Sequence, residues 1–427
     1  MTDEAALERG ATRAISWRLL PLIGLGYLMA FVDRVNIGFA APQMNAQLGF
    51  TASVYGFGGG LFFISYALLE IPSNLALARV GARRWLARIM ITWGLVAMAI
   101  ALVRTPWQFY LGRFLLGAAE AGFFPGVIYY LGLWFPTAHR ARAISRFYVA
   151  APLASLVMGA LAGALLGLDG RLGVRGWQWL LILEGAPAVI LAFAYLRWLP
   201  DRPDDAPWLS AEQKAWLDAR LAAEAAQAAV PDDNLLRALF RPLVVGLTLV
   251  NFLYLGWYYA FTLSAPAVLS AATGLSIGQV GYLTAAGGIT GAIGMIGNGW
   301  LTDRRGDPFL HTAVALLLVA AGFAAIAFSG APPVVEGAYV ATMCAYFAVG
   351  ASIWLMPAGN IHPRALAVSI AAANGFGQLG SFAFPWLWGV MKDATGDYRL
   401  GLALLPAAFL TAGVIVLILR QSLRRRA

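Results

Sequence analysis

The sequence predicts an all-α membrane protein with twelve transmembrane helices in two six-helix halves. Hydrophobic residues occupy 60% of the 427 positions and charged residues only 12%, whereas a soluble domain carries about a quarter charged residues. Apolar runs long enough to cross a bilayer, at about 20 residues each, recur twelve times. These runs are 17–40, 52–78, 85–103, 106–134, 141–167, 177–199, 241–271, 277–301, 309–329, 334–356, 364–390 and 398–420.

A polar segment at 200–240 separates the N-terminal half, 17–199, from the C-terminal half, 241–420. Within this segment, "SAEQKAWLDARLAAEAAQ" predicts an amphipathic helix on the cytoplasmic side, because Ser210 and Gln213 have the spacing of a capping box. Residues 1–16 and 421–427 are expected to be cytoplasmic tails.

The halves also resemble each other as repeats. "SNLALARVGARR" follows the second run and "NGWLTDRRGDP" follows the eighth, and an offset of 225 residues aligns Arg79 with Arg304 and Gly81 with Gly306. Repeated six-helix halves are typical of secondary transporters, which bind substrate between them near the middle of the membrane.

The distribution of Lys and Arg predicts the orientation. If the N-terminus is cytoplasmic, most of the 30 basic residues fall in cytoplasmic segments, which favours two cytoplasmic termini. The outer loops then hold only Arg104, Arg171, Arg175, Lys392 and Arg399.

Composition also narrows the function classes. The net charge of +9 is spread over short loops, so no nucleic-acid partner is expected. The single cysteine, Cys344, excludes an intramolecular disulfide, and three scattered histidines predict neither a metal site nor an enzyme. We expect no cofactor, a bilayer as the surroundings, and a monomer.

Five ionisable residues lie inside apolar runs, where charge is costly and usually functional. Arg113 and Glu120 are two helical turns apart and share a face of span 4. Asp33 and Arg34 are adjacent and point about 100° apart, so one can pair with span 4 while the other faces a cavity. The alternative is a self-neutralising structural cluster. For Glu184, both interpretations stay open.

These charges suit a proton-coupled anion carrier. A guanidinium offers a planar fork that matches a carboxylate, so Arg34 or Arg113 could hold an organic anion. A neighbouring carboxyl is easier to protonate once substrate draws its arginine away. Anion binding and proton binding would then be physically linked.

Polar and aromatic residues at helical spacing complete the predicted substrate site, and hydrogen bonding between helices is the alternative role for them. Asn374 and Gln378 are four residues apart and share a face. The remaining members are Tyr66, Asn251, Tyr254, Tyr258 and Trp354. We expect gating or structural roles near the loops for Glu70, Arg79, Asp303 and Arg304.

Several segments resemble the anion:cation symporter branch of the major facilitator superfamily. They are "YLMAFVDRVNIGFA", "EIPSNLALARVGARRWLARIMITWG", "GRFLLGAAEAGFFPGVIYYLGLWFP" and "GWLTDRRG", and "WQWLLILEGAPAVI" resembles the tartrate-type bacterial members. That branch includes bacterial carriers of tartrate, phthalate and galactonate. One departure is Ala78, which occupies a position where the superfamily usually has an aspartate, whereas Asp303 is kept in the second half.

The resemblance implies a bacterial inner-membrane symporter that imports a small organic anion with protons by alternating access. It implies Arg34 as the carboxylate ligand, Asp33 and Glu120 as proton sites, and Arg113 as the partner of these acids. It also implies substrate contacts for Tyr66, Trp354 and Asn374. The alternatives are an exporter of drugs or metabolites with the same fold and a non-transporting membrane sensor.

Overall fold

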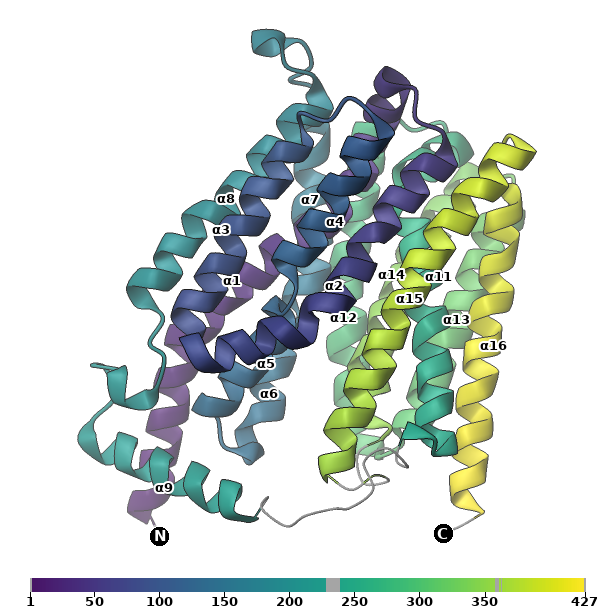
Figure 1. Ribbon diagram of the computed structural model, residues 1–427. Coiled ribbons are helices and arrows are strands. Elements are labelled where there is room, and N and C mark those ends of the chain that lie inside the picture. Colours follow the sequence, from purple (N-terminus) through teal and green to yellow (C-terminus); the bar gives the residue numbers. More distant parts are fainter. Residues whose placement is uncertain (1, 228–238, 358–360, 362, 426–427) are drawn as a thin grey trace.

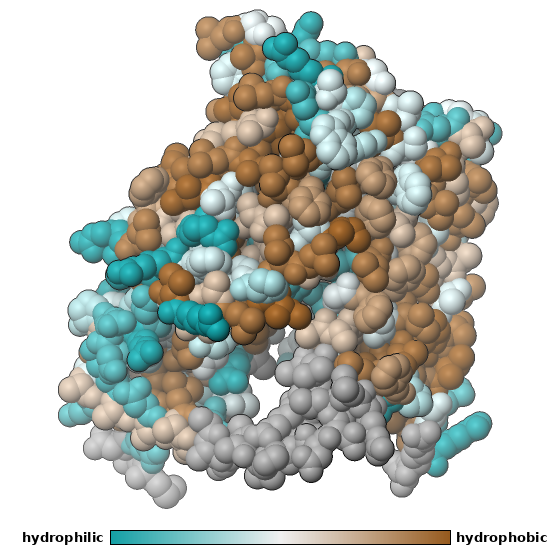
Figure 2. All heavy atoms as spheres, viewed as in Figure 1, coloured by the Kyte–Doolittle hydropathy of each residue, from teal (hydrophilic) through white to brown (hydrophobic). Residues whose placement is uncertain are grey.

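The computed structural model describes residues 2–227, 239–357, 361 and 363–425, which are helical apart from turns and loops and contain no strand. The helices form two bundles that stand side by side, and both chain termini lie at the same end (Figure 1). We call this end the terminal end and the opposite one the far end. Hydrophobic residues dominate the middle of the visible face, and hydrophilic residues gather toward the two ends (Figure 2).

Apolar segments account for most of both bundles. The N-terminal bundle comprises α1 (Thr2–Leu48), α2 (Ala52–Val80), α3 (Ala82–Ile100), α4 (Pro106–Glu120), α5 (Phe123–Trp134), α6 (Thr137–Tyr148), α7 (Ala150–Leu166) and α8 (Gly176–Trp198). The C-terminal bundle comprises α11 (Pro242–Thr273), α12 (Ile277–Arg305), α13 (Pro308–Phe328), α14 (Pro332–Ser352), α15 (Pro363–Thr395) and α16 (Arg399–Arg424). Short 3₁₀ turns occur at Arg171–Gly173, Pro203–Asp205 and Ile353–Leu355.

The twelve predicted runs all fall on these helices, and the predicted fold class is confirmed. Ten segments of the described chain are long and apolar enough to cross a bilayer, counting α4 with α5 and α6 with α7 as single crossings. The other two runs correspond to α3, which carries three arginines near its start, and α15. The aligned glycines Gly81 and Gly306 both end helices with positive φ, at 95° and 67°, which agrees with the predicted repeat register.

Span 4 is not one continuous helix. α4 ends at Glu120, and α5 begins at Phe123 after Gly122, whose φ of 86° is left-handed. Glycine adopts this conformation without the steric cost that a Cβ imposes. Pro125 occupies the first turn of α5, where backbone N–H groups have no partner within the helix. The break places Glu120 at a helix terminus in the middle of the span.

The predicted cytoplasmic helix is present as α9 (Ala211–Gln227). Ser210 and Gln213 form the expected capping box, with N···O distances of 3.1 and 3.2 Å. Glu224 of α9 accepts hydrogen bonds from the backbone N–H and the hydroxyl of Thr137, so α9 contacts the start of α6. Residues 228–238 of the predicted linker and residues 426–427 of the predicted tail lie outside the described residues.

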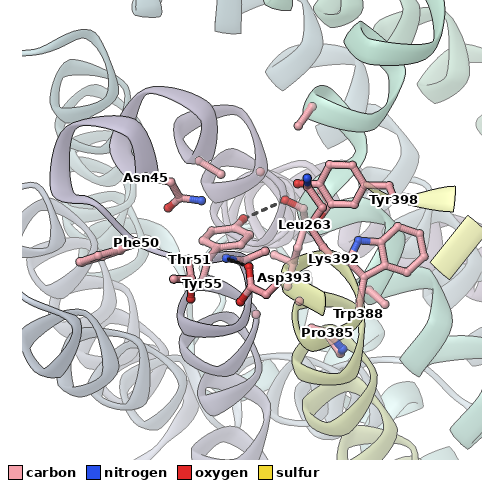
Figure 3. A pocket seen from close by; sticks show the side chains of 18 of the residues that line it. Asn45, Phe50, Thr51, Tyr55, Leu263, Pro385, Trp388, Lys392, Asp393 and Tyr398 are labelled. Atoms are coloured by element: carbon pink, nitrogen blue, oxygen red, sulfur yellow. Dashed lines mark hydrogen bonds between the residues drawn. The ribbon is translucent and has the colours of Figure 1, made fainter. Parts of the chain in front are cut away.

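The two bundles contact each other along α2 with α15, α7 with α12, and α1 with α11. Small residues permit this approach, because a Cβ on Gly60 of α2 would lie 2.6 Å from the backbone oxygen of Phe382 in α15. At the far end, the hydroxyl of Tyr55 donates to the backbone oxygen of Leu263 at 2.8 Å, and this bond joins the bundles (Figure 3).

The carboxylate of Asp393 makes a second link at the far end. Its two oxygens accept from the backbone N–H groups of Ala52 and Ser53 at 2.9 and 2.8 Å, so the end of α15 holds the first turn of α2 (Figure 3). The helix dipole adds to the attraction, since a carboxylate is favourable at a helix N-terminus. Beneath this link lies a cavity of about 340 Å³ lined by Lys392, Trp388 and Tyr398 among others.

We predict that Gly122→Ala destabilises the protein by at least about 1–2 kcal/mol, the order of cost of a left-handed conformation in a residue with a Cβ, because the new Cβ would also lie 2.6 Å from Cβ of Ser73. Thermal unfolding in detergent measures this loss. Gly297→Ala is the matched control, since a Cβ at that helical position meets nothing within 4 Å and alanine favours the helix. Equal stability of the two variants would contradict the assigned role of Gly122.

We predict that the contribution of Asp393 to stability depends on pH. Partial burial raises the pKa of this carboxyl, but hydrogen bonds from Ser53 and Ala52 outweigh it and lower the pKa below its ordinary value. Since the unfolded value is about 3.9, the stabilisation is fully present above it and is lost as the pH falls through the lower folded-state pKa.

Thermal unfolding of Asp393→Asn should therefore differ from wild type at neutral pH, and the difference should shrink in acid. Glu336→Gln, at the same end of the molecule, serves as a control and should show no such convergence. A difference between Asp393→Asn and wild type that is constant with pH would contradict this assignment.

Candidate functional site

The centre of the N-terminal bundle holds a buried ion pair between α1 and α4. Arg34 donates from Nε and Nη2 to Oε1 of Glu120, at 3.0 and 2.6 Å. The Glu120 side chain is 1% exposed and the Arg34 side chain 11%. The second carboxylate oxygen, Oε2, is buried without a hydrogen-bond partner among the described residues. Glu120 therefore depends on one arginine for its compensation.

Aromatic rings surround the arginines. The Arg34 guanidinium lies 5.0 Å from the Tyr66 ring centroid and 5.5 Å from that of Phe62. Arg113 lies 5.1 Å from the same Phe62 ring. Such cation–π contacts are worth about 2 kcal/mol when they are desolvated. They hold both guanidiniums in an apolar interior without neutralising their charge.

Arg113 does not pair with an acid as expected. No carboxylate oxygen of the described residues lies within 4.0 Å of it, and its contact is a weak hydrogen bond from Nη2 to the backbone oxygen of Gly59 at 3.4 Å. Arg34, reaching over from α1, makes the direct contact with the acid of α4 through Oε1 instead. Of the two adjacent charges on α1, Arg34 is therefore the one that makes the direct contact with α4.

Asp33 points away from that pair. Its Oδ1 accepts from Nδ2 of Asn36 at 3.1 Å, and its Oδ2 has no hydrogen-bond partner among the described residues. The residue is 2% exposed. Asp33 thus lies on the inner side of the N-terminal bundle, near α3 and α8, and not in the space between the bundles.

A central cavity of about 80 Å³ lies between the two bundles. Both bundles line it, and most of the lining is aromatic. Of the predicted substrate residues, five line it, namely Arg34, Tyr66, Tyr254, Asn374 and Gln378. Gln378 is 6% exposed and its Oε1 has no partner among the described residues, so the cavity offers one charged donor and an unsatisfied amide oxygen.

Three predicted substrate residues are not in this lining. Asn251 donates to the backbone oxygen of Ala373 at 3.0 Å and so holds α11 against α15. The Tyr258 ring stacks on that of Tyr346 at 3.7 Å between centroids. Trp354 packs against the hydrophobic core in the 3₁₀ turn that follows α14.

Sequence reasoning missed four tyrosines of the cavity: Tyr27, Tyr148, Tyr259 and Tyr346. Tyr27 precedes Arg34 by two helical turns, a spacing that could have identified it. Tyr148 sits where predicted span 5 is divided into α6 and α7, and only the structure places it. Tyr259 is the neighbour of the predicted Tyr258, so the face of α11 that lines the cavity contains Tyr254 and Tyr259 and not Tyr258.

The residues expected at the gates lie near the terminal end. Glu70 and Arg79 are on the last turns of α2, and Asp303 is exposed near the end of α12. Arg304 covers the Trp300 ring at 3.9 Å. No ion pair among the described residues involves these four. Instead, Asp307 accepts from Arg420 at 2.6 Å, an interaction that the repeat pattern did not reveal.

Comparison with known proteins identifies the fold family. A model of the Major Facilitator Superfamily matches residues 23–385. The chain belongs to the major facilitator superfamily. It is therefore a multi-pass membrane transport protein and not an enzyme, and the family expectation from the sequence motifs is confirmed.

Individual relatives cover nearly the whole chain. A "Putative tartrate transporter" of Agrobacterium vitis is 40% identical over 97% of this chain and 92% of its own. A "Quinolone resistance transporter" of Acinetobacter baumannii is 38% identical over 98% and 97%. The solved structure of a bacterial homologue of the human lysosomal transporter Spinster, inward-facing and occupied, matches with a TM-score of 0.73 over 94% of each chain at 18% identity, and thus shares the fold.

We predict a strong energetic coupling between Arg34 and Glu120. Arg34→Ala leaves a buried carboxylate uncompensated and should cost about 3–5 kcal/mol, whereas the Arg34→Ala/Glu120→Ala double variant should recover a large part of that loss. Thermal unfolding in detergent of the two single variants and the double variant measures the coupling. Additive losses of stability would show that Arg34 and Glu120 are not energetically coupled.

Proposed function

We propose that this protein imports a small organic anion together with protons by alternating access of its two halves. The observation that carries the proposal is the Arg34–Glu120 pair beside the central cavity. Arg34 is the one charged residue in the described lining of that cavity, and Glu120 is its partner. An anion that enters the cavity competes directly with Glu120 for the guanidinium.

This competition supplies the coupling to protons. When an anion binds Arg34, no cation remains in direct contact with the Glu120 carboxylate. A buried unpaired charge costs several kcal/mol. Protonation removes that charge. The anion and the proton thus bind together, and the ion pair is restored once both have left. Glu120 is consequently the proposed proton site, and protons are the proposed coupling ion.

The chemistry of the cavity and the relatives support a carboxylate substrate with further polar groups. A guanidinium fork suits a carboxylate, while Gln378, Asn374 and the cavity tyrosines offer hydrogen bonds to hydroxyls. Hydroxy-dicarboxylates such as tartrate and related sugar acids are therefore the favoured candidates, in keeping with the names of relatives that are 40% identical.

The proposed setting is the bacterial inner membrane, with the protein as a monomer and both termini in the cytoplasm. The basis for this orientation is the excess of Arg and Lys in segments on the side of the termini. With this orientation, the far end held by Tyr55 and Asp393 faces outward, and its contacts must separate to admit substrate from outside.

Export of a drug or metabolite is the second candidate. Specific support comes from the aromatic lining, in which Tyr27, Phe124, Tyr148, Tyr259 and Phe347 outnumber the polar groups. A relative named for quinolone resistance has a similar degree of identity. Flat aromatic acids would stack on the aromatic side chains and pair with Arg34 through their carboxylate.

We predict that radiolabelled tartrate enters proteoliposomes faster when an inward proton gradient is imposed. Arg34→Lys should lower uptake about tenfold or more, because hydrogen bonds to a charged group are worth about 1.5–3 kcal/mol and lysine lacks the fork. Arg104→Lys, on an outer loop, is the matched control.

Glu120→Gln should abolish the effect of the gradient but retain tartrate counterflow, since glutamine mimics the protonated acid. Uptake by the wild-type protein that does not respond to the gradient would contradict proton coupling. Aromatic acids and a quinolone assayed in parallel distinguish the second candidate, which requires transport of the quinolone outward.

A further inference from the structure

Glu184 is a buried acid that the Arg34–Glu120 mechanism does not use. It lies in α8, is 6% exposed, and neither of its carboxylate oxygens has a hydrogen-bond partner among the described residues. An ionised carboxylate in such a place costs several kcal/mol unless it is compensated. The described structure provides no ion pair for it within 4.0 Å.

The polar groups that face Glu184 come from α1. They are Asp33 and Asn36, and Asn36 also donates to Oδ1 of Asp33. Oδ2 of Asp33 is buried and has no partner. Two carboxyl groups thus share one interior site, and each has an unsatisfied oxygen.

The surroundings of Glu184 and Asp33 are closely packed. α3 packs closely on α8 next to Glu184. The approach is so close that a Cβ on Gly185 would lie 2.8 Å from the backbone oxygen of Gly94 and 2.9 Å from Cγ of Met98. The fully buried Trp93 of α3 also borders Asp33. The charged groups that face Asp33 from α4 are Arg113 and Glu120; α3 contributes none among the described residues, and the charge nearest to Glu184 is Asp33 itself.

The buried acids of the N-terminal bundle outnumber its buried bases. The described interior of the N-terminal bundle holds three acids, Asp33, Glu120 and Glu184, against two bases, Arg34 and Arg113. Arg34 is matched by Glu120, and Arg113 can balance one more negative charge. Two neighbouring carboxylates that share an apolar site cannot both be ionised, so one proton completes the balance.

We propose that Glu184 and Asp33 share one proton and form a second proton-binding site of the transport cycle, separate from Glu120. In the shared state, the O–H of Glu184 donates to Oδ2 of Asp33, and the pair carries one negative charge, which faces Arg113. Release of the proton to water leaves two carboxylates against Arg113 alone. Glu184 is thereby a positioning residue that sets when Asp33 holds its proton, and this role rests on the proposed proton-coupled transport.

Infrared difference spectroscopy of the full-length protein without substrate tests the shared proton. At neutral pH, we expect a carbonyl stretch from a buried protonated carboxyl group that is lost in Glu184→Gln. It should shift in frequency in Asp33→Asn, where Glu184 stays protonated but loses its carboxylate acceptor. Glu336→Gln, the matched control in the C-terminal bundle, should leave the band unchanged. A band that is unaltered in Glu184→Gln would overturn the proposal.

Two further measurements distinguish a proton that is released during transport from one that is held permanently in the structure. With tartrate as the probe in proteoliposomes, Glu184→Gln should lower the number of protons moved per tartrate by one and flatten the pH profile, while counterflow persists. Loss of the band with an unchanged proton count would overturn the transport role and leave a fixed structural proton. Loss of the wild-type band on addition of sodium would identify a metal-cation site instead.

The spectroscopic result does not depend on transport. If wild-type protein moves no tartrate, then the proposed function with this probe fails, while the band still decides whether Glu184 and Asp33 share a proton.

Discussion

The arrangement of this transporter depends on one constraint, the cost of an unpaired charge in an apolar interior. Arg34 and Glu120 meet that constraint together, with a contact of 2.6 Å in the middle of the N-terminal bundle. Because the arginine also lines the cavity between the bundles, the proposed exchange of this ion pair for a substrate carboxylate would use the same guanidinium that compensates Glu120.

The helix break at Gly122 sets the position of Glu120 in this pair. A continuous span 4 would place Glu120 within an unbroken helix, whereas the turn at Gly122 makes it the last residue of α4. Broken helices are tolerated in membranes where they line cavities or lie within protein. In span 5, Tyr148 ends α6 and lines the same cavity, and Val149 after it keeps right-handed helical angles. The left-handed break at Gly122 therefore lies close to the candidate site.

Much of the site could be predicted because membrane burial makes charge conspicuous. Asp33, Arg34, Arg113 and Glu120 stand out in apolar runs, and the heptad spacing places Arg113 and Glu120 on one face of α4. The partner of Glu120 could not be predicted, since Asp33 and Arg34 are adjacent and the helix spacing does not decide which of the two points toward α4. The structure assigns the contact to Arg34 and turns Asp33 toward α3 and α8.

The sequence by itself determined the fold class, the twelve spans, the capped helix α9 and the glycines that end α2 and α12, because these follow from local hydropathy and backbone preference. Tertiary structure alone decided which groups of different helices come together: Asp393 with the start of α2, Tyr148 and Tyr259 at the cavity, and Glu184 with Asp33. Such contacts join residues distant in sequence, and no local pattern encodes the rotation of one helix against another. For that reason the charges were visible in the sequence, and their pairing was visible only in the packed structure.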